Sequence, residues 1–166
     1  MPVPVLRGPG KGCSMDSSTK KKLLDAEAIA RYDPFSSHNN IRVTATYEDG
    51  SGEGELIVTR ESLNPHGIVH GGALAALADT VGGAATFAAY RRGCVTVNYS
   101  MNFLRPAWGS NRKIRCRAQA VKLGRTLSVF GMSLTDDEGV EVASGNFTFY
   151  ITGWMKSEEE KEPGAI

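Results

Sequence analysis

The stretch of the chain that decides the fold is GGALAALADTVGGAATFAAY, residues 71–90. It holds eight alanines and four glycines, and Asp79 is its one charged side chain. Alanine has the highest helix propensity, so the stretch predicts one long helix. A helix without a polar face has to be buried on all sides, and its small residues let other backbones approach closely. We therefore expect a central helix wrapped by a curved sheet.

Strand patterns lie on both sides of this helix. Residues 41–47 alternate in polarity, and turn residues at 48–52 place a second strand at about 53–59. Four further strands are predicted at 95–104, 113–120, 126–135 and 140–152. Runs of adjacent strands favour an antiparallel sheet, so the fold class is α+β, with about six strands around one long helix.

The two ends of the chain differ from its middle in composition. Residues 1–18 contain three prolines and three glycines, and residues 155–166 contain a run of glutamates beside lysines. We expect both ends to be disordered. A single domain is predicted over 19–154, opening with a short amphipathic helix at 19–31. The N-terminal stretch also lacks the apolar segment of a secretory signal.

Overall composition excludes several classes of protein. The chain has 166 residues, 41% of them hydrophobic, which suits one domain with a real core. Lysine and arginine number 19 against 18 acids, a balance that argues against a nucleic-acid-binding protein. The apolar helix has the length of a membrane span, but an aspartate near its middle is costly in lipid, so we expect no membrane partner.

No metal site or disulfide framework is expected. The three cysteines, Cys13, Cys94 and Cys116, are too few and too scattered for either, which favours a reducing cytoplasmic location. His66 and His70 have the spacing of a helical metal pair, but the proline and glycine beside them disfavour a helix there.

Asp79 is the most informative residue of the helix. Burying a carboxylate without a partner is costly, so a buried aspartate is paired, hydrogen-bonded or functional. Its position alone leaves two interpretations open: an anchor for the backbone amides of a loop, or a catalytic group.

The loop before the helix ends in His70, Gly71 and Gly72. The first amides of a helix have no intrahelical partners and lie at the positive end of its dipole. They can bind an anion or polarise a carbonyl group, and Asn64 can supply a second polar group nearby. The alternative is that the two glycines only permit tight packing.

The spacing of Gly71 and Asp79 bears on assembly. Asp79 lies eight residues beyond Gly71, which corresponds to about 12 Å along one helix. Catalytic contacts are about 3 Å long, so both groups cannot reach one reacting carbon. Either only one of them acts, or Asp79 meets Gly71 of a second copy. Two antiparallel helices across a two-fold axis would bring them together, which predicts a dimer with shared sites if both act.

The chain resembles a known family in these motifs. Asn64, the His70-Gly71-Gly72 triplet and Asp79 together resemble the signature of the hotdog-fold acyl-CoA thioesterases, in their PaaI-like, phenylacetate-pathway branch. The resemblance covers about residues 35–152 and includes a strand that ends in Arg105-Pro106 and the turn 124–126. It implies a hotdog fold, in which an antiparallel sheet cradles one long helix.

This resemblance implies hydrolysis of an acyl-CoA thioester to the free acid and CoA. The Gly71 amide would polarise the carbonyl, and Asn64 would position the substrate or the water. Asp79 of the partner subunit would act as general base or nucleophile, and Thr96 would orient the water. The family is commonly a homodimer that pairs again into a homotetramer. No separate cofactor is implied, because CoA is part of the substrate.

Substrate-binding residues follow from the same resemblance and from the charge of CoA. His70 and Gly72 flank the carbonyl site, and the phosphates of CoA call for cations. The candidate cations are Arg91, Arg92, Lys122 and Arg125, with Arg125 and Lys122 the preferred pair. The candidate acyl-pocket side chains are Phe87, Tyr90, Tyr99 and Phe103.

Two other functions stay open from the sequence. A hotdog hydratase or dehydratase acting on acyl thioesters would pair a histidine, here His70, with an acid on the helix. A non-catalytic acyl-CoA binding module would keep the pocket and Gly71 but would not need Asp79.

Overall fold

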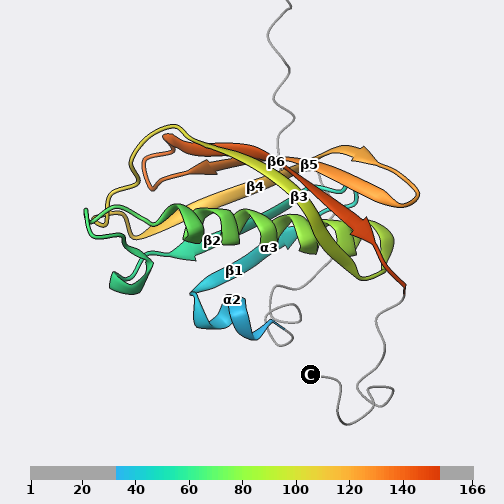
Figure 1. Ribbon diagram of the computed structural model, residues 1–166, viewed down its shortest axis with the longest axis horizontal. Helices are drawn as coiled ribbons and strands as arrows, with labels where there is room; N and C mark the ends of the chain where they lie inside the picture. Colours follow the sequence, from blue (N-terminus) through green and yellow to red (C-terminus); the bar gives the residue numbers. More distant parts are fainter. Residues whose placement is uncertain (1–32, 154–166) are drawn as a thin grey trace, which may run out of the picture.

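The computed structural model describes residues 33–153 of the chain. Its six strands are β1 Ile41–Thr46, β2 Gly52–Ile57, β3 Cys94–Phe103, β4 Lys113–Leu123, β5 Leu127–Thr135 and β6 Glu141–Ile151. They form one antiparallel sheet in the order β1-β2-β4-β5-β6-β3. The sheet curves around the long helix α3, Gly71–Tyr90, which contacts every strand (Figure 1). The predicted α+β architecture is confirmed.

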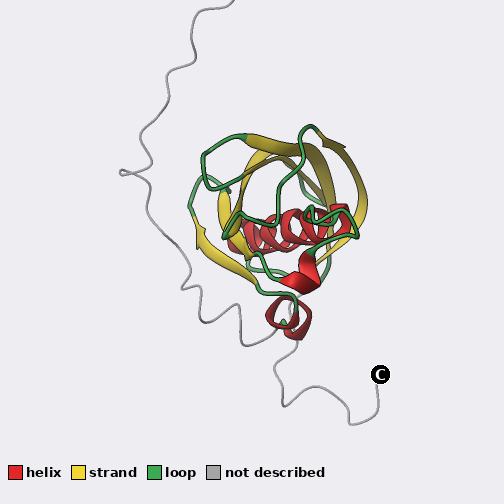
Figure 2. Ribbon diagram, turned by 90° about the vertical axis from the view of Figure 1, so that its left-hand side faces the viewer, coloured by secondary structure: helices red, strands yellow, loops and turns green. Residues whose placement is uncertain are grey.

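Two short elements were not anticipated from the sequence: helix α2, Pro34–His38, and the 3₁₀ turn η2, Arg60–Ser62. Figure 2 shows the strands arching over α3, with α2 on the side that the sheet leaves open. The side chain of Asp33 caps α2 by accepting the Ser36 N–H at 3.0 Å. One helical turn is too short to produce a periodic pattern, which is why the sequence did not predict it. The helix predicted at 19–31 lies outside the described residues.

The core lies between α3 and the concave face of the sheet. Phe130, Phe147 and Phe149 are fully buried there, and the Phe149 ring packs against the other two at centroid distances of 6.0 and 6.3 Å. Gly82 lets the helix approach the sheet, because a Cβ at this position would lie 2.5 Å from the Met132 Cε atom. A buried side chain added there would overpack the core.

The prediction that α3 is buried on all sides is wrong for the single chain. A stripe of half-buried or exposed residues runs along one face of the helix: Gly72, Ala76, Asp79, Gly83 and Phe87. These positions recur every three or four residues, so they share one side of the helix. By length and composition α3 would also suit a membrane span, but half of it is buried against the sheet.

Strand β3 lies beside this stripe at the edge of the sheet, with one side unpaired. Its side chains Val97, Tyr99 and Phe103 are 53%, 54% and 56% exposed. A single chain therefore leaves an apolar strand edge next to a helix stripe whose one charged residue is Asp79. Such a surface is characteristic of an interface.

The two described cysteines are expected to be inert as nucleophiles. Burial raises the pKa of the Cys116 thiol to about 12 and that of Cys94 to about 11, and the charge of Asp79 adds to the effect at Cys94. In a Cys13→Ser variant, we expect iodoacetamide at about pH 8 to label neither thiol in the folded protein and both in denaturant.

The same pKa shifts predict how stability depends on pH. In the unfolded chain both thiols titrate at about pH 8.5. Their contribution to the free energy of unfolding is therefore complete below that pH. It is lost as the pH rises towards 11 and 12, because the unfolded chain releases thiol protons that the folded chain keeps. Rapid labelling of Cys116 in the native protein would contradict its burial.

Candidate functional site

Asp79 and Thr96 meet at the edge of the sheet. The Thr96 hydroxyl on β3 donates a hydrogen bond to the Asp79 Oδ1 atom on α3, at 2.5 Å. Asp79 is half-buried and Thr96 is exposed. Both line a hollow of about 600 Å³ together with Gly72 and Tyr99. The structure thus brings together two of the predicted catalytic residues and one predicted substrate-binding residue.

A bulge in β3 gives Thr96 its direction. The register against β6 shifts between Thr96 and Asn98, so that Thr96 lies opposite Phe149 and Tyr99 lies opposite Phe147. Both phenylalanines are core residues, and the Tyr99 ring stacks on Phe147 at 4.8 Å. In a regular strand, residues three apart would point to opposite faces. The bulge turns Thr96 towards the helix, as bulges beside active sites commonly do.

The N-terminus of α3 leaves one amide without an acceptor. His70 is the N-cap: its Nδ1 atom accepts the Gly72 N–H at 2.9 Å, and its carbonyl oxygen accepts the N–H groups of Ala73 and Leu74. Within residues 33–153, the N–H of Gly71 has no hydrogen-bond acceptor. An available donor at the positive end of a helix can stabilise a developing oxyanion.

Asn64 has a different place in the single chain. Its Oδ1 atom accepts the N–H groups of His66 and Ile68 at 2.9 and 3.2 Å, so the side chain shapes the loop that leads to α3. It does not line the hollow beside Asp79. Neither His66 nor His70 is in a helix, and the described residues contain no cluster of histidine, cysteine, aspartate or glutamate suited to a metal ion.

The two preferred cations lie at the opposite end of α3 from Gly71. Lys122 is the next-to-last residue of β4 and Arg125 is in the β4–β5 turn. The Tyr90 hydroxyl at the end of α3 donates to the Gly124 carbonyl oxygen at 2.8 Å. The structure therefore separates these cations from Gly71 within one chain.

Comparison with known proteins identifies the family. The model of the thioesterase superfamily matches residues 66–143. A putative esterase of Haemophilus influenzae is 32% identical over 104 residues, which cover 61% of this chain and 73% of that protein. The chain belongs to the thioesterase superfamily. The matched segment contains His70, Gly71, Asp79 and Thr96, whereas Asn64 lies just before it.

Several solved structures share the fold. A thioesterase from Haemophilus influenzae has a TM-score of 0.72 at 25% identity and covers 84% of this chain and 98% of its own. A hypothetical thioesterase from Streptococcus pneumoniae, solved with coenzyme A, has a TM-score of 0.68 at 26% identity and covers 80% and 100%. The E. coli PaaI protein has a TM-score of 0.71 at 24% identity and covers 78% and 91%. The predicted hotdog fold and enzyme class, a thioester hydrolase, are confirmed.

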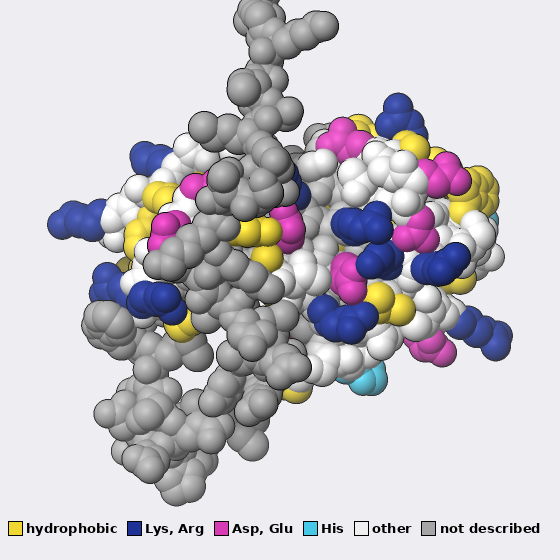
Figure 3. All heavy atoms as spheres, turned by 180° about the vertical axis from the view of Figure 1, so that it is seen from behind, with side chains coloured by type: hydrophobic (Ala, Val, Ile, Leu, Met, Phe, Trp, Pro, Cys, Tyr) yellow, Lys and Arg dark blue, Asp and Glu magenta, His cyan; other side chains and the backbone are white. Residues whose placement is uncertain are grey.

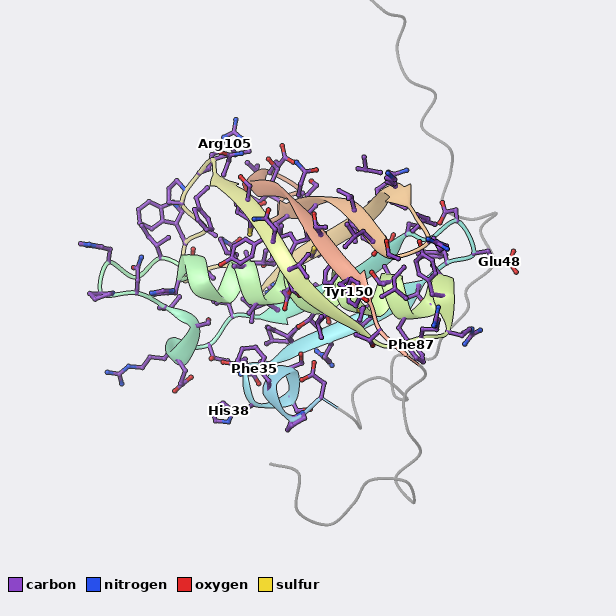
Figure 4. The ribbon with its side chains drawn as sticks, turned by 45° about the vertical axis from the view of Figure 1, so that its right-hand side comes forward. Phe35, His38, Glu48, Phe87, Arg105 and Tyr150 are labelled. Carbon is purple, nitrogen blue, oxygen red and sulfur yellow. The ribbon has the colours of Figure 1, made fainter. Side chains whose placement is uncertain are left out.

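Sequence reasoning missed a second hollow of this thioesterase. It measures about 460 Å³ and lies between α2, η2 and the first half of α3. Phe35 and His38 of α2 line it (Figure 4), and Gly72 and Ala76 also line the hollow beside Asp79. The one available signal was Asp33-Pro34, a residue pair typical of a helix start.

Proposed function

We propose that this thioesterase hydrolyses an acyl-CoA thioester to the free acid and CoA. The observation that carries the proposal is the hydrogen bond from Thr96 to Asp79. It orients the Asp79 carboxylate in the hollow that residues of α3 and β3 line. The coenzyme A present in the Streptococcus pneumoniae relative supports CoA as the thiol part of the substrate.

The proposed chemistry uses groups of the chain and one water molecule. The Gly71 N–H donates to the thioester carbonyl oxygen, and the α3 dipole stabilises the negative charge that develops there. Asp79 takes a proton from water, whose oxygen forms the new bond to the carbonyl carbon. The tetrahedral intermediate then collapses and the carbon–sulfur bond breaks. The proton held by Asp79 passes to the departing CoA thiolate, which restores the carboxylate. Thr96 holds Oδ1 of the carboxylate, which leaves Oδ2 as the proton acceptor.

A nucleophilic role for Asp79 is the alternative within the same reaction. The carboxylate would then displace the CoA thiolate to form a mixed anhydride with the acyl group, and water would attack the Asp79 carboxyl carbon to release the acid. A single turnover in heavy-oxygen water separates the two routes. Only the nucleophilic route transfers the heavy oxygen into Asp79, and mass spectrometry of the peptide that contains it detects the label.

We also propose that the working unit is a homodimer with shared sites. Gly71 and Asp79 lie about 12 Å apart along one straight helix. A second copy packed antiparallel on the part of the α3 stripe between Gly72 and Asp79 would cover that part, pair its β3 edge with this one, and place its Gly71 beside this Asp79. Pairing of such dimers into a tetramer and a cytoplasmic location remain predictions.

Mixing two inactive variants tests the shared site. In a heterodimer of Asp79→Asn and Gly71→Pro chains, one site combines the intact Gly71 of the first chain with the intact Asp79 of the second. We expect an equimolar mixture, refolded together, to regain about a quarter of wild-type thiol release, since half the dimers are mixed and each has one intact site.

Each variant refolded alone is the control for this experiment. Without shared sites, the mixture stays as inactive as its components. Analytical ultracentrifugation of the same samples shows independently whether dimers have formed.

The two rival functions predict different contacts. A hydratase would need His70 paired with an acid, but its Nδ1 atom is occupied by the Gly72 N–H, and no acid in residues 33–153 hydrogen-bonds to it. A binding module has no use for the oriented Asp79 carboxylate. A product assay distinguishes all three: free thiol supports hydrolysis, a hydrated acyl thioester supports the hydratase, and binding without turnover supports the module.

A further inference from the structure

Tyr90, the last residue of α3, ties the helix to the β4–β5 turn. Its hydroxyl donates to the Gly124 carbonyl oxygen at 2.8 Å, which is the only hydrogen bond between α3 and this turn in the described part of the chain. Burial raises the pKa of the Tyr90 phenol, so the hydroxyl stays protonated and remains a donor at neutral pH. The turn is also held by bonds from Gly124 N–H to the Leu127 carbonyl and from Ile151 N–H to the Thr126 carbonyl, both at 2.9 Å.

The hydrogen bond from Tyr90 to Gly124 joins the end of α3 to the β4–β5 turn, so four cations lie at the same end of the molecule. They are Arg91, Arg92, Lys122 and Arg125. None of them forms an ion pair within residues 33–153. On the face shown in Figure 3, basic and acidic side chains lie intermixed, and Glu55 pairs with both Arg42 and Lys113. Cations are also favoured at the C-terminal end of a helix by its dipole.

Two acids reduce the charge at this end but do not cancel it. Gly50 packs against Leu123, which brings Glu48 and Asp49 of the β1–β2 turn to the same end. Figure 4 shows Glu48 at the end of α3 that carries Phe87. Among the side chains of residues 33–153 at this end, four cations against two carboxylates leave an excess of two positive charges. An anion that binds there should therefore be held in a salt-dependent way.

The distance from Asp79 to this end matches the length of one part of CoA. Tyr90 lies eleven residues beyond Asp79, which is about 16 Å along α3 and within about 20° of the same face. The pantetheine arm has about 13 bonds between sulfur and phosphorus. An extended polypeptide has three backbone bonds per residue, and scaling from its length gives a reach of about 15 Å for the extended arm. Gly83 and Phe87 lie between the two points on the same half-exposed stripe.

We propose that Tyr90 is a positioning residue that holds the β4–β5 turn so that Lys122 and Arg125, with Arg91, meet the phosphates of CoA. This end of the protein then selects CoA thioesters over thioesters that lack the nucleotide. The inference rests on the proposed hydrolysis of acyl-CoA. It needs no residue of a second copy, because Asp79 and the turn belong to one chain.

The test compares one acyl group on two thiols, CoA and pantetheine, in the Tyr90→Phe variant of the full chain. We expect KM for the CoA thioester to rise about three- to tenfold, the effect of losing one hydrogen bond, with kcat nearly unchanged. KM for the pantetheine thioester should stay at the wild-type value. Arg125→Ala, an exposed change that cannot unfold the core, should give the same pattern.

Tyr47→Phe is the matched control, since it removes a hydroxyl that donates to Glu53 at 3.2 Å, away from the turn. It should leave the ratio of the two KM values unchanged. High salt should reduce the wild-type preference for CoA, because the proposed contacts are between exposed charges.

Three outcomes would overturn the inference. Equal changes in KM for both thioesters in Tyr90→Phe would mean that Tyr90 has a structural role only. No change in KM for either would mean that the hydrogen bond to Gly124 does not contribute to substrate binding. A wild-type enzyme that does not prefer CoA would have no phosphate subsite. Absence of wild-type turnover on both thioesters is a separate result, which overturns the proposed function itself.

Discussion

The Asp79→Asn variant is expected to lose about a hundred- to ten-thousandfold in kcat, the usual contribution of a general base. Asparagine has nearly the same shape, and its Oδ1 atom can still accept the hydrogen bond from Thr96, so the site geometry should be preserved. What it lacks is the ability to take a proton from water. Thiol release from a series of short, medium, long and aromatic acyl-CoAs measures the effect.

Glu141→Gln is a closely matched control for this change. The Glu141 carboxylate also accepts a hydrogen bond from a hydroxyl, that of Ser133, at 2.8 Å, but it lies outside the hollow that contains Asp79. We expect near wild-type turnover from Glu141→Gln and an unchanged unfolding temperature for both variants. Substantial activity in a folded Asp79→Asn protein would remove Asp79 from the mechanism.

The Gly71→Pro variant is expected to lose about a hundred- to thousandfold in kcat, as when one oxyanion donor is removed. Gly71 is the first residue of α3, where proline is well tolerated because its missing N–H would have no partner in the helix. His70 already has the extended backbone, φ −62° and ψ 135°, that a residue before proline prefers. The substitution therefore deletes the proposed donor while leaving the helix intact.

Gly71→Ala separates the lost N–H from the added bulk. A Cβ at this position would lie 3.1 Å from the Phe103 ring, and both variants carry that carbon. Alanine keeps the N–H, so we expect it to retain most of the turnover. Equal losses in the two variants would assign the effect to crowding against Phe103, and the carbonyl would then need another donor.

Local patterns were sufficient to predict most of the fold. The helix at 71–90 has the bounds that its alanine-rich composition predicted, and the strand patterns gave the six strands to within a few residues. The largest error in a strand is at the end of β4, which runs to Leu123 because a bulge between Ala120 and Lys122 interrupts the alternation. A bulge depends on the partner strand, so a single strand's pattern does not reveal it.

The candidate site was predicted only in part. Asp79 stood out as the one carboxylate in an apolar helix, and Gly71 as a helix start, since both signals are local. The capping role of His70 was not predicted, because side-chain oxygens rather than imidazoles are the usual N-caps. Asn64 was given a role with the substrate, whereas in this chain its oxygen atom is used by its own loop.

By itself, the sequence determined the long helix, the positions of the strands along the chain and the separation of Gly71 from Asp79. Helix rise and side-chain periodicity depend only on neighbouring residues. Only the tertiary structure decided that Thr96 reaches Asp79 and that Tyr90 holds Gly124. These contacts join residues 17 and 34 positions apart. They depend on the β3 bulge, on the place of β3 at the sheet edge and on how far the sheet curves around the helix, which arise from the packing of the whole domain.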